Sequence, residues 1–348
     1  MNFTRESIFV SATRCLCNSF ATVVGVAVAG AVILIGLSIL SSPEIVPNKS
    51  DLVIAPDAKG NRTILAENSP VILRINIHGV IGEPALTAQS VENLLLDSRE
   101  DLLRNNRVKA ILLHVNTPGG TVDDADGIYR SLLKYKETYK IPVYAFVDGM
   151  CASGGMYVCS AADKIYATTP SVIGSVGVIL GPSFNFSEVM DKIGIKSLTI
   201  KQGKDKDMLN PFRPWVPGED QSLVNITQNL YENFVDIVTS ARTKLKKQDL
   251  INTYGAQVFL SKQAQDYGYI DYSDSSYSAA LTDLVSAANI DDTQPYQVVQ
   301  LEAPTSLLSS LIQGKSPLIS GKLYHSFPIG TNISSELSGK FLYLYQPN

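Results

Sequence analysis

An uncharged run of twenty-one residues, 20–40, restricts how the start of this chain can fold. As an α-helix it would span about 30 Å, the thickness of the hydrocarbon core of a bilayer. The run is longer than the core of a cleaved signal peptide, which is usually about 7–15 residues. A Ser-Ser-Pro sequence at 41–43 weakly resembles a cleavage site and keeps that alternative open. We expect an uncleaved, single-pass transmembrane helix.

The charges that flank the run predict its direction. Arg5 and Arg14 precede it, whereas Glu44, Lys49 and Asp51 follow it. Cytoplasmic loops carry an excess of Lys and Arg. The bias therefore predicts a cytoplasmic N-terminus at 1–19 in the cell (inner) membrane. Everything after the helix is then extracytoplasmic.

The rest of the chain is expected to hold one α/β domain. Residues 41–69 are rich in Pro, Asn, Asp and Lys and are typical of a linker. Runs typical of strands occur at 71–81, 108–115 and 142–147, and amphipathic helical patterns at 85–105, 121–140 and 219–244. Strands that alternate with helices predict βαβ units and mostly parallel pairing. The domain is expected over 70–290. Residues 291–348 form a C-terminal extension of unknown role, with a strand pattern at 296–301 and a helix-like stretch at 305–313.

Composition excludes several classes of function. The formal charge is −4, which argues against a nucleic-acid binder held by electrostatics. A hydrophobic content of 45% excludes general disorder. The four cysteines include no C-x-x-C pair, so a zinc module is not expected. No metal or cofactor is predicted.

Two glycine-rich turns are the candidate sites of chemistry. Residues 116–121, Asn-Thr-Pro-Gly-Gly-Thr, lie between an expected strand and helix, where free backbone N–H groups can hold an anion. Residues 148–157 place Ser153 before two glycines at a similar junction. A turn or N-cap serine is the simplest interpretation. A nucleophile would need a base, either a histidine or a lysine whose charge is disfavoured by burial.

Four sequence blocks in order resemble the signal peptide peptidase A family of membrane-anchored serine proteases. The blocks are Pro-Gly-Gly at 118–120, Ala-Ser-Gly-Gly-Met-Tyr at 152–157, Ala-Ala-Asp-Lys-Ile-Tyr-Ala at 161–167 and Gly-Ser-Val-Gly-Val at 174–178. The resemblance covers roughly 70–285. It implies a crotonase-like fold related to the Clp protease subunit, built from repeated ββα units in a superhelix. Met156 departs from the family, which usually has Tyr there.

The resemblance also implies a Ser/Lys dyad. Ser153 matches the nucleophile and Lys206 the general base, because an acid and two apolar residues follow this lysine before a polar-Pro step. Lys201 and Lys204 lie close by, and a solvated charge run is the alternative for all three lysines. Ser175 matches a serine that orients the lysine, with a turn hydroxyl as its alternative. The oxyanion hole is implied at Gly119 or Gly120, together with Gly154.

The implied function is hydrolysis of hydrophobic peptides at the membrane, chiefly cleaved signal peptides. The chain holds one copy of each motif, so the resemblance to the half-length form implies a cyclic homo-oligomer in which a neighbour completes each dyad. Two alternatives remain. The same fold could serve a crotonase-type acyl-CoA enzyme, or a non-catalytic membrane scaffold.

Overall fold

The computed structural model describes residues 8–40, 50–291, 294–302 and 341–345, and the chain divides into two compact units at Lys49 and Ser50. The first unit contains helix α1, Ile8–Leu40. Its stretch Val10–Ala31 is long and apolar enough to cross a membrane, and none of it is buried. The helix includes the whole predicted segment 20–40 and begins twelve residues before it.

The second unit is built on a mixed sheet with the strand order β1-β9-β2-β3-β5-β7-β8, in which β6 also pairs with β5. The strands are β1 Asp51–Ala55, β2 Val71–His78, β3 Val108–Thr117, β5 Val143–Ala152, β6 Lys164–Ala167, β7 Val172–Gly174, β8 Val258–Leu260 and β9 Gln297–Glu302. Pairing from β9 through β7 is parallel, and the edge strands β1 and β8 are antiparallel to their neighbours. The predicted α/β class is confirmed.

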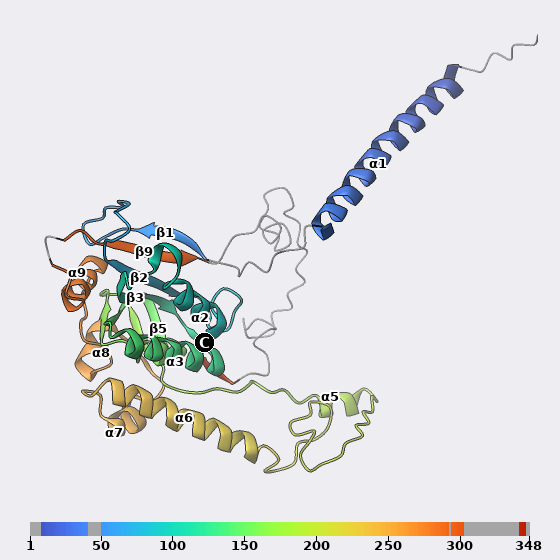
Figure 1. Ribbon diagram of the computed structural model, residues 1–348. Helices are drawn as coiled ribbons and strands as arrows, with labels where there is room; N and C mark the ends of the chain where they lie inside the picture. The colour runs from blue at the N-terminus through green and yellow to red at the C-terminus, as the bar shows by residue number, and fades with distance from the viewer. Residues whose placement is uncertain (1–7, 41–49, 292–293, 303–340, 346–348) are drawn as a thin grey trace, which may run out of the picture. The chain divides into compact units, whose positions relative to one another are not determined.

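Helices cover both faces of the sheet because side chains on a strand alternate between its faces. Leu73, Ile75 and Ile77 of β2 lie in the core under α2 and α3, whereas Ile72 belongs to the core under α9 (Figure 1). These helices are α2 Ala88–Asp97, α3 Val122–Tyr139 and α9 Tyr277–Ala287. The remaining helices are α4 Gly154–Cys159, α5 Ser187–Lys192, α6 Gln221–Ala241, α7 Lys247–Asp249 and α8 Ser261–Tyr267, with a 3-10 turn at Asp101–Leu103 and a π-helical turn at Leu250–Tyr254.

A strand–strand–helix unit recurs at the start of the domain. In one copy β3 is followed by the short strand β4, Gly119–Thr121, and then by α3. In the copy before it, β2 is followed by Ile81 and then α2, and Ile81 bridges Gly120 in parallel. The short segments therefore form a second layer beside the main sheet. This recurrence agrees with the ββα units that the family resemblance implies.

The structure extends the domain beyond 70–290 at both ends. Strand β1 lies within the expected linker and pairs with β9, which lies within the expected extension. The sequence of β1, Asp-Leu-Val-Ile-Ala, lacks the alternation that marks a half-buried strand, and the first three of these residues are exposed. The helix expected over 85–105 ends at Asp97, where Ser98 follows as its C-cap. The helix-like stretch 305–313 lies outside the described residues.

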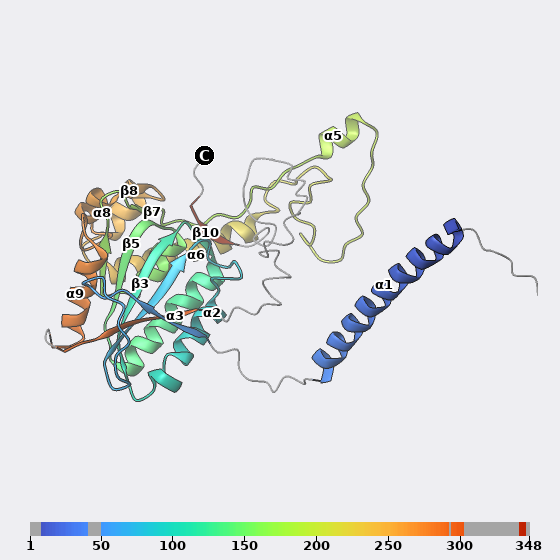
Figure 2. The ribbon, with the colours of Figure 1, turned by 90° about the horizontal axis from the view of Figure 1, so that it is seen from above.

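Residues 183–218, called the arm below, leave the sheet between β7 and α6. Every hydrogen bond described for the arm stays within residues 185–222. Phe186 stacks between Phe184 and Phe212, with ring centroids 6.4 and 6.5 Å away. In two perpendicular views the arm helix α5 lies away from the sheet (Figures 1 and 2). The arm is thus held together by its own contacts.

Candidate active site

Ser153 occupies a sharp turn between strand β5 and helix α4. Its φ is 54° and its ψ is −115°, a backbone conformation that few residues other than glycine adopt. The Ser153 N–H donates to the Gly174 carbonyl on the neighbouring strand β7 at 2.8 Å. Ser153 holds the N-cap position, but its hydroxyl makes no capping hydrogen bond. A strained turn with a hydroxyl that makes no capping hydrogen bond resembles a nucleophile elbow more than an ordinary N-cap. The turn at Ser153 is called the elbow below.

The glycines predicted for the oxyanion hole come together beside this turn. A Cβ atom added to Gly119 would lie 2.6 Å from the Gly154 nitrogen, and one added to Gly154 would lie 3.2 Å from the Gly120 nitrogen. The φ of Gly119 is 97°, which also favours glycine at that position. The Gly119 N–H already donates to the Thr117 hydroxyl at 3.0 Å. A side chain at these positions would close the space between β4 and α4.

A C-terminal strand fills this space, and the sequence did not predict it. Strand β10, Leu342–Leu344, pairs antiparallel with β4 and places Tyr343 opposite Gly120. The Tyr343 carbonyl oxygen lies between the glycines, because it would be 1.9 Å from a Cβ atom on Gly119 and 3.1 Å from one on Gly154. The groove beside Ser153 therefore accommodates an extended backbone with a carbonyl oxygen aimed at the proposed oxyanion hole.

The Tyr343 side chain fills an aromatic pocket next to the elbow. Its ring centroid lies 5.1 Å from that of Tyr157 and 4.4 Å from that of Phe234, and the side chain is fully buried. The Tyr343 hydroxyl donates to the Leu230 carbonyl at 3.0 Å. Burial raises the pKa of the Tyr343 hydroxyl, so it remains a neutral donor. The pocket thus holds a large aromatic side chain of an extended segment.

Ser175 lies close to the elbow, at the end of the strand beside it. Gly174 pairs with Ala152, so Ser175 and Ser153 are the next residues along two paired strands. Ser175 also has a φ of 54° and is buried, and its N–H donates to the Gln257 carbonyl at 2.7 Å. The structure therefore brings Ser175 together with Ser153 and the glycines.

Lys206 does not lie beside Ser153, unlike Ser175 and the predicted glycines. It lies in the arm with an exposed side chain, for which no hydrogen bond or ion pair to another described residue is found. Lys201 pairs with Asp207, and the Lys204 amine lies 3.9 Å from the Asp205 carboxylate. No contact described in the structure joins Lys206 to Ser153 or Ser175. Within one chain, the predicted pair of Ser153 and Lys206 does not come together.

Comparisons with known proteins identify the family. The sequence profile of Peptidase family S49 matches residues 136–291. The chain is 29% identical to a putative signal peptide peptidase SppA from Enterococcus faecium over 205 residues, which are 58% of this chain and 59% of the relative. It is 31% identical to a putative protease from Synechocystis over 200 residues, 58% of this chain and 68% of the relative. The chain belongs to peptidase family S49.

The resemblance to the signal peptide peptidase A family is thereby confirmed. A putative protease from Methanocaldococcus jannaschii is 32% identical over 193 residues, 56% of this chain and 60% of the relative. The match to this relative and to that from Enterococcus spans about three fifths of their own lengths. Among solved structures, a Listeria monocytogenes ClpP1 variant matches 60% of this S49 chain and 94% of its own, with 18% identity and a TM-score of 0.40.

The histidines of this S49 chain lie in other surroundings. His78 and His114 are neighbours on β2 and β3, and an Arg74 guanidinium nitrogen lies 2.7 Å from His114 Nδ1. Burial, with the nearby charge of Arg74, lowers the pKa of His114 to about 3, so its ring is neutral at physiological pH. Neither ring contacts Ser153 or Ser175 in the described part of the chain. His325 lies outside the described residues.

Two cysteines lie within the elbow. Cys151 on β5 and Cys159 on α4 are free and buried, with their sulfur atoms 3.4 Å apart. Hydrogen bonding to Cys159 and burial raise the pKa of the Cys151 thiol, which disfavours the reactive thiolate. Both side chains therefore pack as thiols of the hydrophobic core.

Proposed function

We propose that this S49 peptidase is a membrane-anchored serine endopeptidase that hydrolyses hydrophobic peptides, chiefly cleaved signal peptides. The observation that carries the proposal is the Tyr343 carbonyl oxygen between Gly119 and Gly154, beside the strained Ser153. A peptide that binds as β10 does would run antiparallel to β4 and present a carbonyl to the same backbone. A large apolar side chain would then enter the pocket of Tyr157 and Phe234.

The chemistry follows from the predicted roles of the residues. The Ser153 hydroxyl attacks the peptide carbonyl carbon, and its proton passes to the neutral amine of Lys206. The backbone N–H groups of Gly120 and Gly154 receive the developing oxyanion, because that of Gly119 donates to Thr117. The loss of such a contact typically costs about 10²–10³ in rate. Lys206 then protonates the leaving amine, and water hydrolyses the acyl-serine by the same route in reverse. Because only the neutral amine accepts a proton, activity rises with pH.

A neighbouring copy of the chain would supply Lys206. The support is the exposed Lys206 side chain on an arm that makes its hydrogen bonds only within residues 185–222. The arm also exposes many large apolar side chains, which are costly to leave in water unless a partner covers them. They are Phe184, Phe186, Val189, Ile193, Ile195, Leu198, Ile200, Phe212, Trp215 and Val216. In a closed ring each arm would pack on the next subunit and bring its Lys206 to that subunit's Ser153.

A fluorophosphonate probe separates this function from the alternatives. The probe forms a covalent bond with an activated serine hydroxyl, so we expect one label on Ser153 in the membrane-extracted protein and none in Ser153→Ala. The control Ser240→Ala removes an exposed serine of α6 and should keep the label. A crotonase-type acyl-CoA enzyme or a scaffold would not be labelled at Ser153. Mass spectrometry of the labelled peptide identifies the site.

The orientation of the anchor can be tested separately. Arg5 and Arg14 precede the predicted segment 20–40, and one lysine with two acids follows it, a bias that favours a cytoplasmic N-terminus. Alkaline phosphatase fused after Asn348 should therefore be active, because it folds only outside the cytoplasm, and β-galactosidase fused there should be inactive. The opposite pattern would place the peptidase domain in the cytoplasm and remove the proposed supply of signal peptides.

A further inference from the structure

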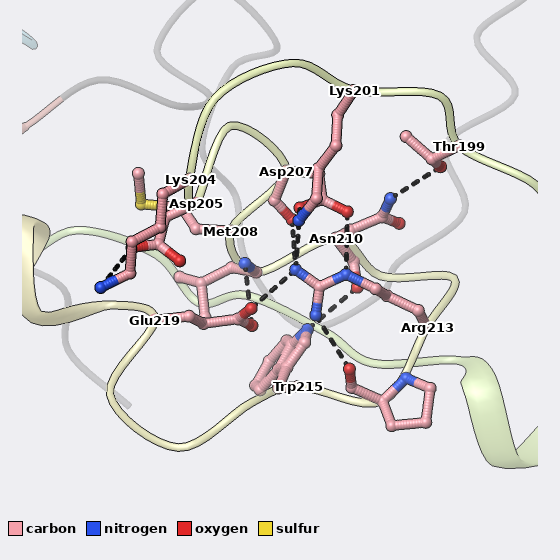
Figure 3. Close-up of polar contacts among 12 residues, drawn as sticks. Thr199, Lys201, Lys204, Asp205, Asp207, Met208, Asn210, Arg213, Trp215 and Glu219 are labelled. Carbon is pink, nitrogen blue, oxygen red and sulfur yellow. Dashed lines mark hydrogen bonds and ion pairs between the residues drawn. The ribbon is translucent and has the colours of Figure 1, made fainter.

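Arg213 is at the centre of a polar network that joins the arm to Glu219, the residue that follows it (Figure 3). Its Nε donates to the Asp207 carboxylate at 2.9 Å, and its Nη2 donates to the Glu219 carboxylate at 2.6 Å. The same Nη2 donates to the Asp207 backbone carbonyl at 2.7 Å. The Glu219 carboxylate in turn accepts the Leu209 N–H at 3.2 Å. One guanidinium thus fixes both side chains and main chain directly after Lys206.

The network also fixes an unfavourable backbone. Asp205 and Leu209 have φ values of 57° and 54°, the left-handed region that non-glycine residues rarely adopt. Such conformations persist only where surrounding contacts hold them. Trp215 adds a further contact, because its Nε1 donates to the Asn210 carbonyl at 3.0 Å. The turn that carries Lys206 is therefore held by contacts that converge from residues 213–219.

The charges in this network balance without Lys206. Lys201 and Arg213 pair with Asp207, Arg213 also pairs with Glu219, and Lys204 lies by Asp205. Three cations thus face three carboxylates. Lys206 is the additional cation, and no ion pair is described for it. The sequence places Lys206 next to two acids, and the network gives both of them another partner.

We propose that Arg213 is a positioning residue for Lys206, which holds the turn in shape and keeps the Asp207 carboxylate from pairing with the lysine amine. This inference rests on the proposed function, in which Lys206 must be neutral to accept the Ser153 proton. A carboxylate free to contact the amine would stabilise its protonated form. Arg213 would then serve catalysis without touching substrate.

The network keeps its charge throughout the pH range of an assay. Hydrogen bonds from Arg213 and Lys201 hold the pKa of Asp207 well below its usual range. Hydrogen bonding from Arg213 likewise lowers the pKa of Glu219, and the two acids raise that of Arg213. The other charged groups of this loop are Lys204, Asp205 and Asp220. A shift of the activity profile near neutral pH would therefore not come from titration of Asp207, Glu219 or Arg213.

The test is the pH profile of peptide hydrolysis by Arg213→Gln in the full-length protein. We expect kcat to fall about tenfold to a hundredfold, because a displacement of about 1 Å is enough for such a loss. KM should change little. The acid limb of the profile should also move upward by about half to one pH unit, since an Asp207 carboxylate that has lost Arg213 and keeps only Lys201 can approach the Lys206 amine and favour the ammonium. Lys262→Gln, which breaks an exposed ion pair on α8, is the matched control and should change neither quantity.

A second substitution separates electrostatics from shape. In Arg213→Gln/Asp207→Asn the Asp207 carboxylate is gone, so the acid limb should return toward the wild-type position while kcat stays low. Arg213→Lys, which keeps the charge but loses the forked contact, should show a smaller shift and guards against misfolding of the glutamine variant. If the kcat of Arg213→Gln falls with an unmoved acid limb, or if the double variant keeps the shift, the positioning role is wrong.

Lys206→Ala in the same assay separates a failure of the proposed role of Arg213 from a failure of Lys206 as the proposed base. Loss of activity in Lys206→Ala, with a wild-type rate and profile in Arg213→Gln, would overturn the positioning role alone. Activity retained in Lys206→Ala would overturn both the proposed base and the role of Arg213.

Discussion

Mixing inactive Ser153→Ala chains with inactive Lys206→Ala chains is expected to restore peptide hydrolysis. Each variant alone should lose at least about a thousandfold in kcat, because a nucleophile and its base act as one unit. In a mixed ring, some sites pair the intact serine of one chain with the intact lysine of its neighbour. With equal amounts and random mixing, about a quarter of the sites are complete, so about a quarter of wild-type activity should return.

The measurement needs proof that subunits exchange. The two variants should carry different tags, be mixed in detergent, and be purified through both tags in sequence before the assay. The control mixture pairs Ser153→Ala with Ser153→Ala/Lys206→Ala, which contains no intact serine and should stay inactive. Two results would exclude a shared site: no recovery in doubly purified rings, or full activity in a wild-type preparation shown to be monomeric.

The turn at Ser153 could be singled out from the sequence because its characteristic residues are contiguous. Gly-Gly at 119–120 and Ser-Gly-Gly at 153–155 each follow a strand-like run, and the ends of adjacent parallel strands meet at one edge of a sheet. The structure places Ser153 and Ser175 directly after two paired strand residues, Ala152 and Gly174. The patterns pointed to Ser153, whereas Ser175 was implied only by the family resemblance. The simplest interpretation of Ser153 was a turn or N-cap serine. Ser153 does hold the N-cap position, but its hydroxyl makes no capping hydrogen bond.

The parts that sequence reasoning missed depend on contacts between distant residues. Strand β10 pairs with β4, which lies more than two hundred residues earlier in the sequence. With only three residues, β10 is too short to show the alternation of apolar and polar side chains that indicates a strand. A solvated charge run was the alternative interpretation of Lys201, Lys204 and Lys206, and all three side chains are exposed. Sequence reasoning did not single out Arg213, whose partners Asp207 and Glu219 lie six residues before and after it. Neither a helix nor a strand brings residues six apart into contact.

Tyr343→Ala is expected to lower the KM for hydrophobic peptides by about tenfold, with little change in kcat. Because β10 occupies the groove beside Ser153, a peptide must compete with an intramolecular segment whose effective concentration is typically millimolar. Removal of the Tyr343 ring deletes its packing on Tyr157 and Phe234 and frees the pocket for a substrate side chain. Steady-state hydrolysis of a fluorogenic apolar peptide gives both constants.

The control for this variant is the same substitution two residues further along. Tyr345→Ala keeps the backbone hydrogen bond from residue 345 to the Pro118 carbonyl and leaves the Tyr343 ring in its pocket, so its KM should match the wild type. If β10 were instead a fixed wall of the groove, Tyr343→Ala would lower the melting temperature and raise KM, because the site would lose one side. A fall in KM therefore means that the groove's own strand competes with the peptide, and a rise means that it helps to hold the peptide.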